Sequence, residues 1–411
     1  MATIKDSVHD HIEVEGVAAA LLDTPAVQRL RRIRQLGTVS YVYPSANHTR
    51  FEHSLGVYHL ACRALDGLGI RGKQAERIRA AALLHDIGHS PFSHNIEAVI
   101  YRHTGQYHDD VGDLLAESPV GNVLRDHELD PAAVADLIAG DGQYGQLVSG
   151  ELDVDRMDYL VRDAHHTGVP YGTIDHGRLV RELTFEDGKL VLQAGNVQAA
   201  ESLLIARALM NPTVYSHHVA RISKSLLRRG TERLIDEESI PATRVRRMDD
   251  SDLLVAMRTH DSTAGYADAL DQRDLFKRAV WAELRDVPEE IIDADHETIR
   301  ELEAEIATHA EVPSEHVILD IPDRPAMTES TTRVVVGNEV RRLDEQSPLV
   351  EALRSAQQSQ WRLGVYAPDG ATEQVGHAAA SVLGLDIDGG LVSEVHGTHY
   401  ARLDEFDPDS N

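Results

Sequence analysis

One stretch of the chain, residues 77–97 with the sequence RIRAAALLHDIGHSPFSHNIE, restricts the fold more than any other. Its first half is rich in Ala, Ile and Leu and predicts a helix buried on more than one side, yet His85 and Asp86 follow directly. A buried carboxylate beside an imidazole is costly unless a cation neutralises it. We therefore interpret His85 and Asp86 as ligands of a divalent metal ion, placed near the end of a helix that breaks at Gly88.

Two further stretches complete the predicted metal site. Residues 48–65, HTRFEHSLGVYHLACRAL, predict a helix with His53 at its start, and residues 153–166, DVDRMDYLVRDAHH, predict another helix that carries Asp155. Together with the His-Asp pair they supply two imidazoles and two carboxylates. This ligand set suits manganese, iron, zinc or, less well, magnesium, and it leaves positions for water and a phosphate oxygen.

The order of these blocks resembles the HD-domain metal phosphohydrolases, and in particular their deoxynucleoside triphosphate triphosphohydrolase branch. The resemblance is carried by HTRFEHSLGV, LLHDIGHSPFSH and ELDVDRMDYLVRDAHHTG, together with the amino-terminal segments IKDSVHDHIEVEG and LLDTPAVQRLRRIRQLG, and it runs on to about residue 230. It implies an all-helical core. It also implies that the metal ligands are His53, His85, Asp86 and Asp155.

The resemblance further implies catalytic roles for residues that follow the His-Asp pair. If a helix begins at Pro91, then His94 and Glu97 lie one turn apart, and the carboxylate raises the pKa of the imidazole. By analogy with the family, His94 is the candidate general acid and Glu97, where the branch more often shows Asp, is its partner. His89 is expected to contact a phosphate, and His108 is a candidate second catalytic imidazole.

The family's substrate contacts also have counterparts in this chain. Glu52 has two interpretations, since it either orients the imidazole of His53 or caps the helix. The chain departs from the best-characterised branch at Asn211 and His218, where His and Lys are expected. The implied substrate-binding residues are Arg50 and Arg156 for phosphate groups, Gln35 and Leu36 for the sugar pocket, Tyr159 and Asp163 for the deoxyribose, and Arg207, Tyr215 and His217 for further contacts.

The composition narrows the possible partners and the compartment. With 40 basic against 68 acidic residues the net charge is −28, which disfavours nucleic acids and anionic membranes as partners. Only five residues are lysine, and this acid-rich, lysine-poor composition leads to the hypothesis of a halophilic, salt-loaded cytoplasm. A single cysteine, Cys62, excludes an internal disulfide. The sequence shows neither a membrane-spanning run nor the apolar core of a signal peptide at its start, so we expect a soluble cytoplasmic protein.

We expect a mainly α protein in three parts. These are an HD phosphohydrolase domain over residues 1–240, a smaller α+β region over 241–400, and an acidic disordered tail over 401–411. The individual elements expected are an extended lead-in over 1–20, a helix from Thr24 to Leu36 that ends at Gly37, an extended segment over 39–44, a helical pattern over 196–235 interrupted by Pro212, a helix over 265–284, strands within 316–322, 332–337 and 362–368, and a helix over 347–360.

The predicted function is a metal-dependent phosphohydrolase of nucleotides. The preferred reaction cleaves deoxynucleoside triphosphates, dGTP among them, to deoxynucleoside and triphosphate. Two alternatives stay open: hydrolysis of another nucleotide or of a phosphate monoester, and a non-catalytic regulator that binds nucleotides or nucleic acid. A nucleotide substrate and further copies of the same chain, in a homo-oligomer, are the expected partners.

Overall fold

The computed structural model describes residues 2–337 and 339–385 and divides into two compact units. Among the described residues, the first unit comprises those up to 274 together with 326–355, and the second comprises 275–325 together with 356–385. The predicted division at residue 240 stays a prediction, because compactness alone does not define a folding domain. The predicted acidic tail lies outside the described residues.

The chain begins with a two-stranded antiparallel hairpin. Strands β1 (Ala2–Asp6) and β2 (Asp10–Val14) pair with Ile4 opposite Ile12, so the predicted extended lead-in covers both strands. Helix α1 (Gly16–Leu22) follows.

The predicted helix from Thr24 to Leu36 is wrong in its second half. Helix α2 (Pro25–Arg29) and a 3-10 turn, η1 (Leu30–Arg32), end before residue 33. Beyond them the backbone N–H of Gln35 donates to the carbonyl of His48, and the N–H of Arg50 donates to the carbonyl of Ile33. This pairing with a distant segment replaces the helical hydrogen bonds. The segment expected to be extended over 39–44 begins instead as a 3-10 helix, η2 (Gly37–Tyr41).

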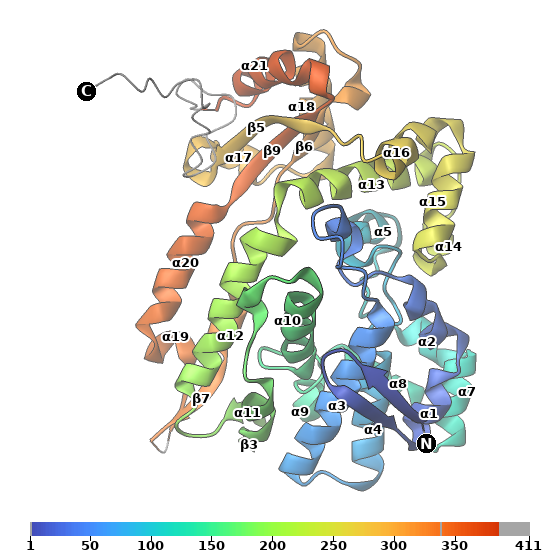
Figure 1. Cartoon of the computed structure of the whole chain (residues 1–411), viewed down its shortest axis with the longest axis vertical. Helices are drawn as coiled ribbons and strands as arrows, with labels where there is room; N and C mark the ends of the chain where they lie inside the picture. The colour runs from blue at the N-terminus through green and yellow to red at the C-terminus, as the bar shows by residue number, and fades with distance from the viewer. Residues whose placement is uncertain (1, 338, 386–411) are drawn as a thin grey trace, which may run out of the picture. The chain divides into compact units, whose positions relative to one another are not determined.

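Three packed helices position the predicted metal ligands. Helix α3 (Arg50–Leu68) packs against α4 (Gly72–Leu84) and against α10 (Val154–Thr167), as Figure 1 shows in blue and green. Their inward faces, among them Leu60, Leu83 and Leu160, are fully buried. Burial of these faces supplies most of the stability of such helices, since propensity alone is marginal.

The His-Asp pair lies just beyond the end of α4 rather than inside the helix. Helix α4 ends at Leu84, so the predicted break at Gly88 comes four residues earlier, and His85 and Asp86 belong to the turn that follows. The helix predicted to begin at Pro91 is also wrong. A 3-10 turn, η3 (Ser93–Asn95), comes first, and α5 (Glu97–Thr104) begins after it.

The remaining elements of the first unit surround this core. The expected helical pattern over 196–235 is confirmed as α12 and α13, with a π turn at Pro212. The small sheet has the strand order β3-β4-β7-β8. These elements are α6 (Gly112–Ala116), α7 (Pro119–Asp126), α8 (Pro131–Ile138), α9 (Gly142–Gly145), α11 (His176–Arg181), β3 (Leu183–Glu186), β4 (Lys189–Leu192), α12 (Val197–Met210), η5 (Asn211–Tyr215), α13 (His218–Asp236), α14 (Ala242–Arg247), α15 (Asp250–Thr259), α16 (Asp261–Asp271), β7 (Arg333–Val336), β8 (Glu339–Arg342), α19 (Leu343–Gln346) and α20 (Pro348–Gln360).

The second unit is an α+β fold with its own core. Its antiparallel sheet has the order β5-β9-β6, and Val280, Ile306, Leu363 and Val375 belong to the core. The predicted helix over 265–284 is wrong beyond α16, because its later residues pair with β9 as a strand. The elements are β5 (Lys277–Glu283), α17 (Glu289–Ile292), α18 (His296–His309), β6 (Ile318–Asp320), β9 (Arg362–Ala367) and α21 (Thr372–Val382).

The predicted fold class, a mainly α protein with a smaller α+β region, is confirmed. The strands predicted within 316–322, 332–337 and 362–368 are present as β6, β7 and β9. Within the described residues, no helix is both long and apolar enough to span a membrane.

Candidate metal centre and active site

The structure brings all four predicted metal ligands together. Side-chain donor atoms of His53, His85 and Asp86 lie within 4.8 Å of one another, and all three residues are buried. Nε2 of His53 is 3.3 Å from Nε2 of His85 and 3.8 Å from Oδ2 of Asp86. Asp155 joins them from α10, with Oδ1 2.8 Å from Nε2 of His53 and 3.8 Å from Nε2 of His85.

The electrostatics of this group fit a divalent cation. Burial opposes protonation of His53, but hydrogen bonds to Asp155 and Asp158 outweigh it and raise its pKa to about 10. Burial also disfavours the charged form of Asp86, yet the nearby Arg50 and His85 hold its pKa well below its usual range. The carboxylates thus favour a positive charge among these donors, and a divalent cation bound by the same atoms would supply that charge.

Helix caps fix the start of both ligand-bearing helices. Glu52 accepts hydrogen bonds from the backbone N–H (2.6 Å) and the hydroxyl (2.7 Å) of Thr49, so of its two interpretations the structure shows the cap. Asp153 caps α10 by accepting from the backbone N–H of Arg156 at 2.7 Å.

The residue that orients His53 is Asp158, whose contact the sequence analysis missed. Oδ2 of Asp158 lies 2.8 Å from Nδ1 of His53, on the edge of the ring opposite the metal site. Asp158 also forms an ion pair with Arg162. The signal available in the sequence was the spacing of three residues between Asp155 and Asp158, which places both carboxylates on one side of α10.

Arg50 lies beside the metal site, bound to a predicted ligand. Its Nη1 donates to both carboxylate oxygens of Asp86 at 3.0 and 3.1 Å, and its Nε donates to Oγ of Ser93 at 2.9 Å. The guanidinium is buried. Contact between Arg50 and a phosphate group stays a prediction, and in this structure its charge neutralises Asp86.

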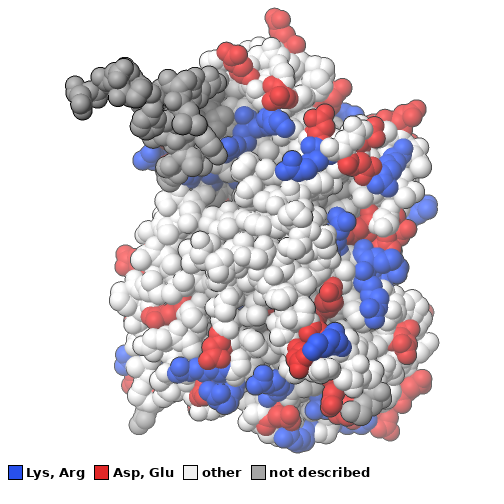
Figure 2. Space-filling model, in the orientation of Figure 1, with Lys and Arg blue, Asp and Glu red and all other residues white. Residues whose placement is uncertain are grey.

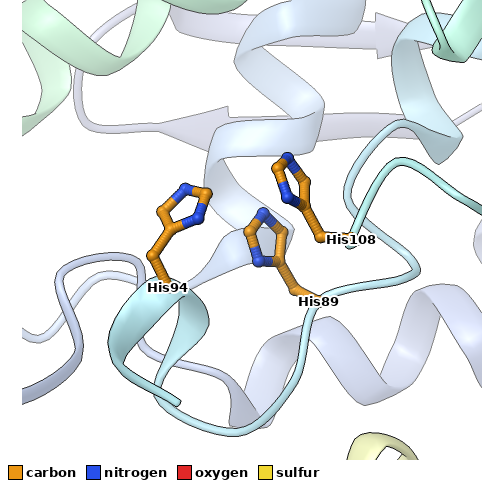
Figure 3. A group of neighbouring side chains, drawn as sticks. All are labelled: His89, His94 and His108. Carbon is orange, nitrogen blue, oxygen red and sulfur yellow. The ribbon is translucent and has the colours of Figure 1, made fainter. Parts of the chain in front are cut away.

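His89, His94 and His108 form a second group, which we call the histidine cluster (Figure 3). Glu97 accepts from Nδ1 of His94 at 2.8 Å and from Nδ1 of His108 at shorter range. The ring of His94 stands edge-on to those of His89 and His108, at centroid distances of 4.6 and 4.9 Å. His89 connects the cluster to the metal site, with Nε2 3.1 Å from Oδ1 of Asp86.

The geometry of the histidine cluster suits an anion better than a metal ion. The rings of His89 and His108 stack at a centroid distance of 4.2 Å with an angle of 17° between their planes. Their lone pairs therefore lie in nearly parallel planes and cannot both point at one ion about 2.1 Å from each nitrogen. N–H groups from several imidazoles can, in contrast, surround the oxygens of a phosphate.

Glu97 raises the pKa of His94 as predicted, but other contributions outweigh it, so the net shift is downward. Surrounding protein atoms disfavour the charged imidazole and, together with Arg50, lower the pKa of His94 in spite of Glu97. The same burial acts on His108, but there Glu97 outweighs it and the pKa of His108 is raised. The side chain of His94 is 52% exposed, so a substrate can reach it.

Several predicted substrate contacts lie close to Asp163. One carboxylate oxygen of Asp163 lies 2.8 Å from Nε2 of His48, and the other accepts from the hydroxyl of Tyr215 at 2.9 Å. The ring of Tyr159 stands edge-on to that of Tyr215. Gln35 approaches the same group, since its backbone N–H donates to the carbonyl of His48.

The other predicted substrate residues have structural contacts of their own. Leu36 is partly buried against the core, and Arg156 donates to the carbonyl of Glu151 at 2.9 Å. Arg207 is near enough to Tyr159 for its charge to act on the phenol. His217 caps α13 by accepting from the backbone N–H of Val219 at 3.2 Å. A substrate role for these four residues stays a prediction.

Comparison with known proteins identifies the family. Residues 50–163 match the HD domain, and residues 174–394 match the HD associated region. MJ1154 of Methanocaldococcus jannaschii, a protein described as uncharacterized, is 34% identical over 90% of this chain and 79% of its own length. The deoxynucleoside triphosphate triphosphohydrolase SAMHD1 homolog of Dictyostelium discoideum is 31% identical, over 53% of this chain and 46% of its own length.

A solved structure agrees with these sequence matches. A phosphohydrolase from Bacteroides thetaiotaomicron superposes with a TM-score of 0.70 and 25% sequence identity, covering 90% of this chain and all of that one. The resemblance inferred from the sequence blocks is thereby confirmed. The chain belongs to the HD-domain phosphohydrolase family, in the branch that resembles SAMHD1.

Proposed function

We propose that this chain is a metal-dependent phosphohydrolase that cleaves deoxynucleoside triphosphates to deoxynucleoside and triphosphate. The observation that carries the proposal is the convergence of His53, His85, Asp86 and Asp155 beside the histidine cluster. The SAMHD1 homolog, which carries this activity in its name, supports the choice of substrate.

The metal site would supply the electrophile. A divalent ion held by the four ligands would polarise a phosphate oxygen and lower the pKa of a water molecule. The chain's own part is to hold the ligands in place and to balance charge. Arg50 does this at Asp86, and it is also our candidate for balancing charge on the phosphate.

Glu97 orients two of the three imidazoles in the histidine cluster. It holds Nδ1 of His94 and of His108, which leaves Nε2 of each ring for the substrate. His108, whose pKa is raised, stabilises negative charge on the phosphate, and His89 adds a buried N–H. His94 protonates the leaving oxygen, because the charge of a bound triphosphate raises the pKa of His94, which the surrounding protein atoms and Arg50 have lowered.

The group around Asp163 is our candidate sugar pocket. The carboxylate of Asp163, already held by His48 and Tyr215, accepts from a 3′-hydroxyl with its remaining lone pairs. Within the described residues, Oε1 of the buried Gln35 has no hydrogen-bond partner, so a ligand would satisfy it. Leu36 beside it excludes a 2′-hydroxyl, and Tyr159 stacks on the sugar.

A second candidate function rests on the departures at Asn211 and His218. Since the best-characterised branch is expected to have His and Lys there, a different nucleotide or a phosphate monoester is the alternative substrate. In that case the metal site and the histidine cluster keep their roles, and only the sugar pocket has a new occupant.

A substrate panel tests the proposal. Purified protein is incubated with Mn²⁺, Fe²⁺, Zn²⁺ or Mg²⁺ and with dNTPs, NTPs or monophosphates, at low and high salt, and products are resolved by ³¹P NMR. Triphosphate from dNTPs supports the proposal, while inorganic phosphate from monoesters supports the alternative. Tight nucleotide binding without turnover under every condition would indicate a non-catalytic regulator. Light scattering of the same sample tests the predicted homo-oligomer.

The surface charge and the exposed apolar side chains bear on which partners the chain could bind. On the face shown in Figure 2, acidic and basic side chains are both present, and a broad area carries neither. On α12, Ile205 and Leu209 are among the exposed apolar side chains. We propose no nucleic-acid partner, on the ground of the net charge of −28.

A further inference from the structure

A second buried group of charged side chains lies at the Nδ1 edge of His53, away from the other predicted ligands. It consists of Asp6 and His9 from the amino-terminal hairpin and Asp158 and Arg162 from α10, and we call it the hairpin cluster. Asp158 and Arg162 are completely buried, and Asp6 is nearly so. Such a group is costly unless every charge is paired.

Asp158 is saturated with donors. Its Oδ1 lies 2.6 Å from Nε2 of His9 and accepts from Nη2 of Arg162 at 3.0 Å. Its Oδ2 accepts from Nε of Arg162 at 2.8 Å and lies 2.8 Å from Nδ1 of His53. A carboxylate offers about four lone-pair sites, and all four are used here. Asp158 is therefore an acceptor only, and Nδ1 of His53 must carry the hydrogen.

This contact selects the form of His53 that a metal requires. With the hydrogen on Nδ1, the other ring nitrogen, Nε2, is the one that faces His85, Asp86 and Asp155 and can offer its lone pair to an ion bound there. Metal-binding histidines commonly donate their second N–H to a carboxylate in this way, which fixes both the tautomer and the ring orientation.

The hairpin holds the other side of Arg162. Nη1 of Arg162 donates to Oδ2 of Asp6 at 2.8 Å, and Nη2 donates to Oδ1 at 3.2 Å. Oδ1 of Asp6 also accepts from the backbone N–H groups of Val8 and His9, at 2.9 and 2.8 Å, which closes the turn between β1 and β2. The same carboxylate thus shapes the turn that presents His9 and anchors the guanidinium that holds Asp158.

From these contacts we infer that the amino-terminal hairpin is a structural part of the metal centre. Asp158 is a positioning residue for His53, and Asp6 and His9 hold Asp158 in turn, so the first ten residues of the chain set the orientation of a ligand on α3. The inference rests on the proposed role of His53 as a metal ligand. It assigns a role in metal binding to residues that touch neither the ion nor the substrate.

Metal binding by variants tests this inference without reference to turnover. Apoprotein is titrated with Mn²⁺ by calorimetry, and its Co²⁺ form is recorded by visible absorption, which reports the ligand geometry. D158N replaces an acceptor-only group by one that also donates, and we expect about a 10- to 100-fold loss of affinity together with a changed Co²⁺ spectrum. D6N leaves Asp158 in place but weakens the hold on Arg162, and a smaller loss in the same direction is expected.

The hairpin offers a matched control. Asp10 lies in the same hairpin, in an exposed ion pair with Lys5, so D10N removes a charge without touching the hairpin cluster and should leave affinity and spectrum unchanged. H53A should lose the metal. If H53A binds metal as the wild type does, the proposed metal site is itself wrong.

If H53A loses the metal while D158N and D6N keep wild-type affinity and spectrum, the metal site stands and the role of the hairpin is refuted. Circular dichroism of the apoproteins verifies that each variant is folded. Should D158N fail to fold, D6N alone decides: unchanged affinity refutes the inference, and a loss that D10N does not share supports it.

Discussion

Two glycines on the same helix, Gly56 and Gly67 of α3, should respond in opposite ways to replacement by alanine. Alanine is favoured over glycine inside a helix by about 0.5–1 kcal/mol. A Cβ at residue 67 would have no atom within 4 Å, apart from its own neighbours in the helix. G67A should therefore raise the free energy of unfolding by about 0.5–1 kcal/mol.

G56A meets the hairpin cluster instead. A Cβ at residue 56 would lie 1.9 Å from Oδ1 of Asp158 and 2.5 Å from Nη2 of Arg162, both completely buried. The methyl group has to displace one member of this ion pair, and breaking a buried pair costs about 3–5 kcal/mol. After the gain of about 1 kcal/mol in helix propensity, G56A should lower the free energy of unfolding by about 2–4 kcal/mol.

Urea denaturation of both variants, with EDTA present to remove any metal, measures these two changes. Mn²⁺ titration of the folded proteins should then show weakened binding in G56A and wild-type binding in G67A, because only the first displaces the carboxylate behind His53. A G56A variant that gains stability as G67A does would show that Asp158 and Arg162 do not pack against α3, and the reasoning would be refuted.

Three other predictions address the chemistry and the solvent. D86A should lose both metal binding and turnover. Its control is D66N, which removes an exposed carboxylate on α3 and should keep both. Full activity of D86A would contradict the metal assignment. The pKa of His108 is raised in the folded protein, so activity that needs its charge is present at low pH and lost as pH rises through that pKa. E97Q should move this alkaline limb of the kcat profile to lower pH. An unmoved limb would show that the contact between Glu97 and His108 does not control the activity. The net charge of −28 predicts that unfolding shifts to higher temperature as salt rises toward about 1 M, where the Debye length is about 3 Å, and full stability in dilute buffer would argue against the halophilic hypothesis.

The predicted ligand set followed from the sequence because its signals are local. An adjacent His85 and Asp86 after an apolar helix, His53 at the start of a second predicted helix and carboxylates at helical spacing on a third indicate a buried polar site. The resemblance to the family implied the same four ligands. The structure brings these residues together.

The errors in the fold have a common physical cause. Residues 33–35 follow a helical pattern but pair with the backbone of 48–50, and residues 277–283 follow another but pair with β9. Both partners are distant in the sequence, so no local preference reveals them, and tertiary pairing overrides propensity.

The hairpin cluster was hidden for a similar reason. Asp6 and His9 lie about 150 residues before Asp158, in a segment whose alternation predicts only extended structure. Gly56 gave a weak signal, since a glycine inside a helix is unfavourable unless something packs closely against it.

Two carboxylates near the metal site, the buried Asp158 and the partly buried Glu97, each hold a pair of imidazoles, and they differ in what balances their charge. Asp158 holds His9 and His53 and is balanced by the permanent charge of Arg162, so this arrangement fixes an orientation. Glu97 holds His94 and His108 and raises the pKa of His108, so the charge that balances it is one that an imidazole gains or loses with pH. Because a proton can move and a guanidinium charge cannot, the first carboxylate serves the scaffold and the second serves the chemistry.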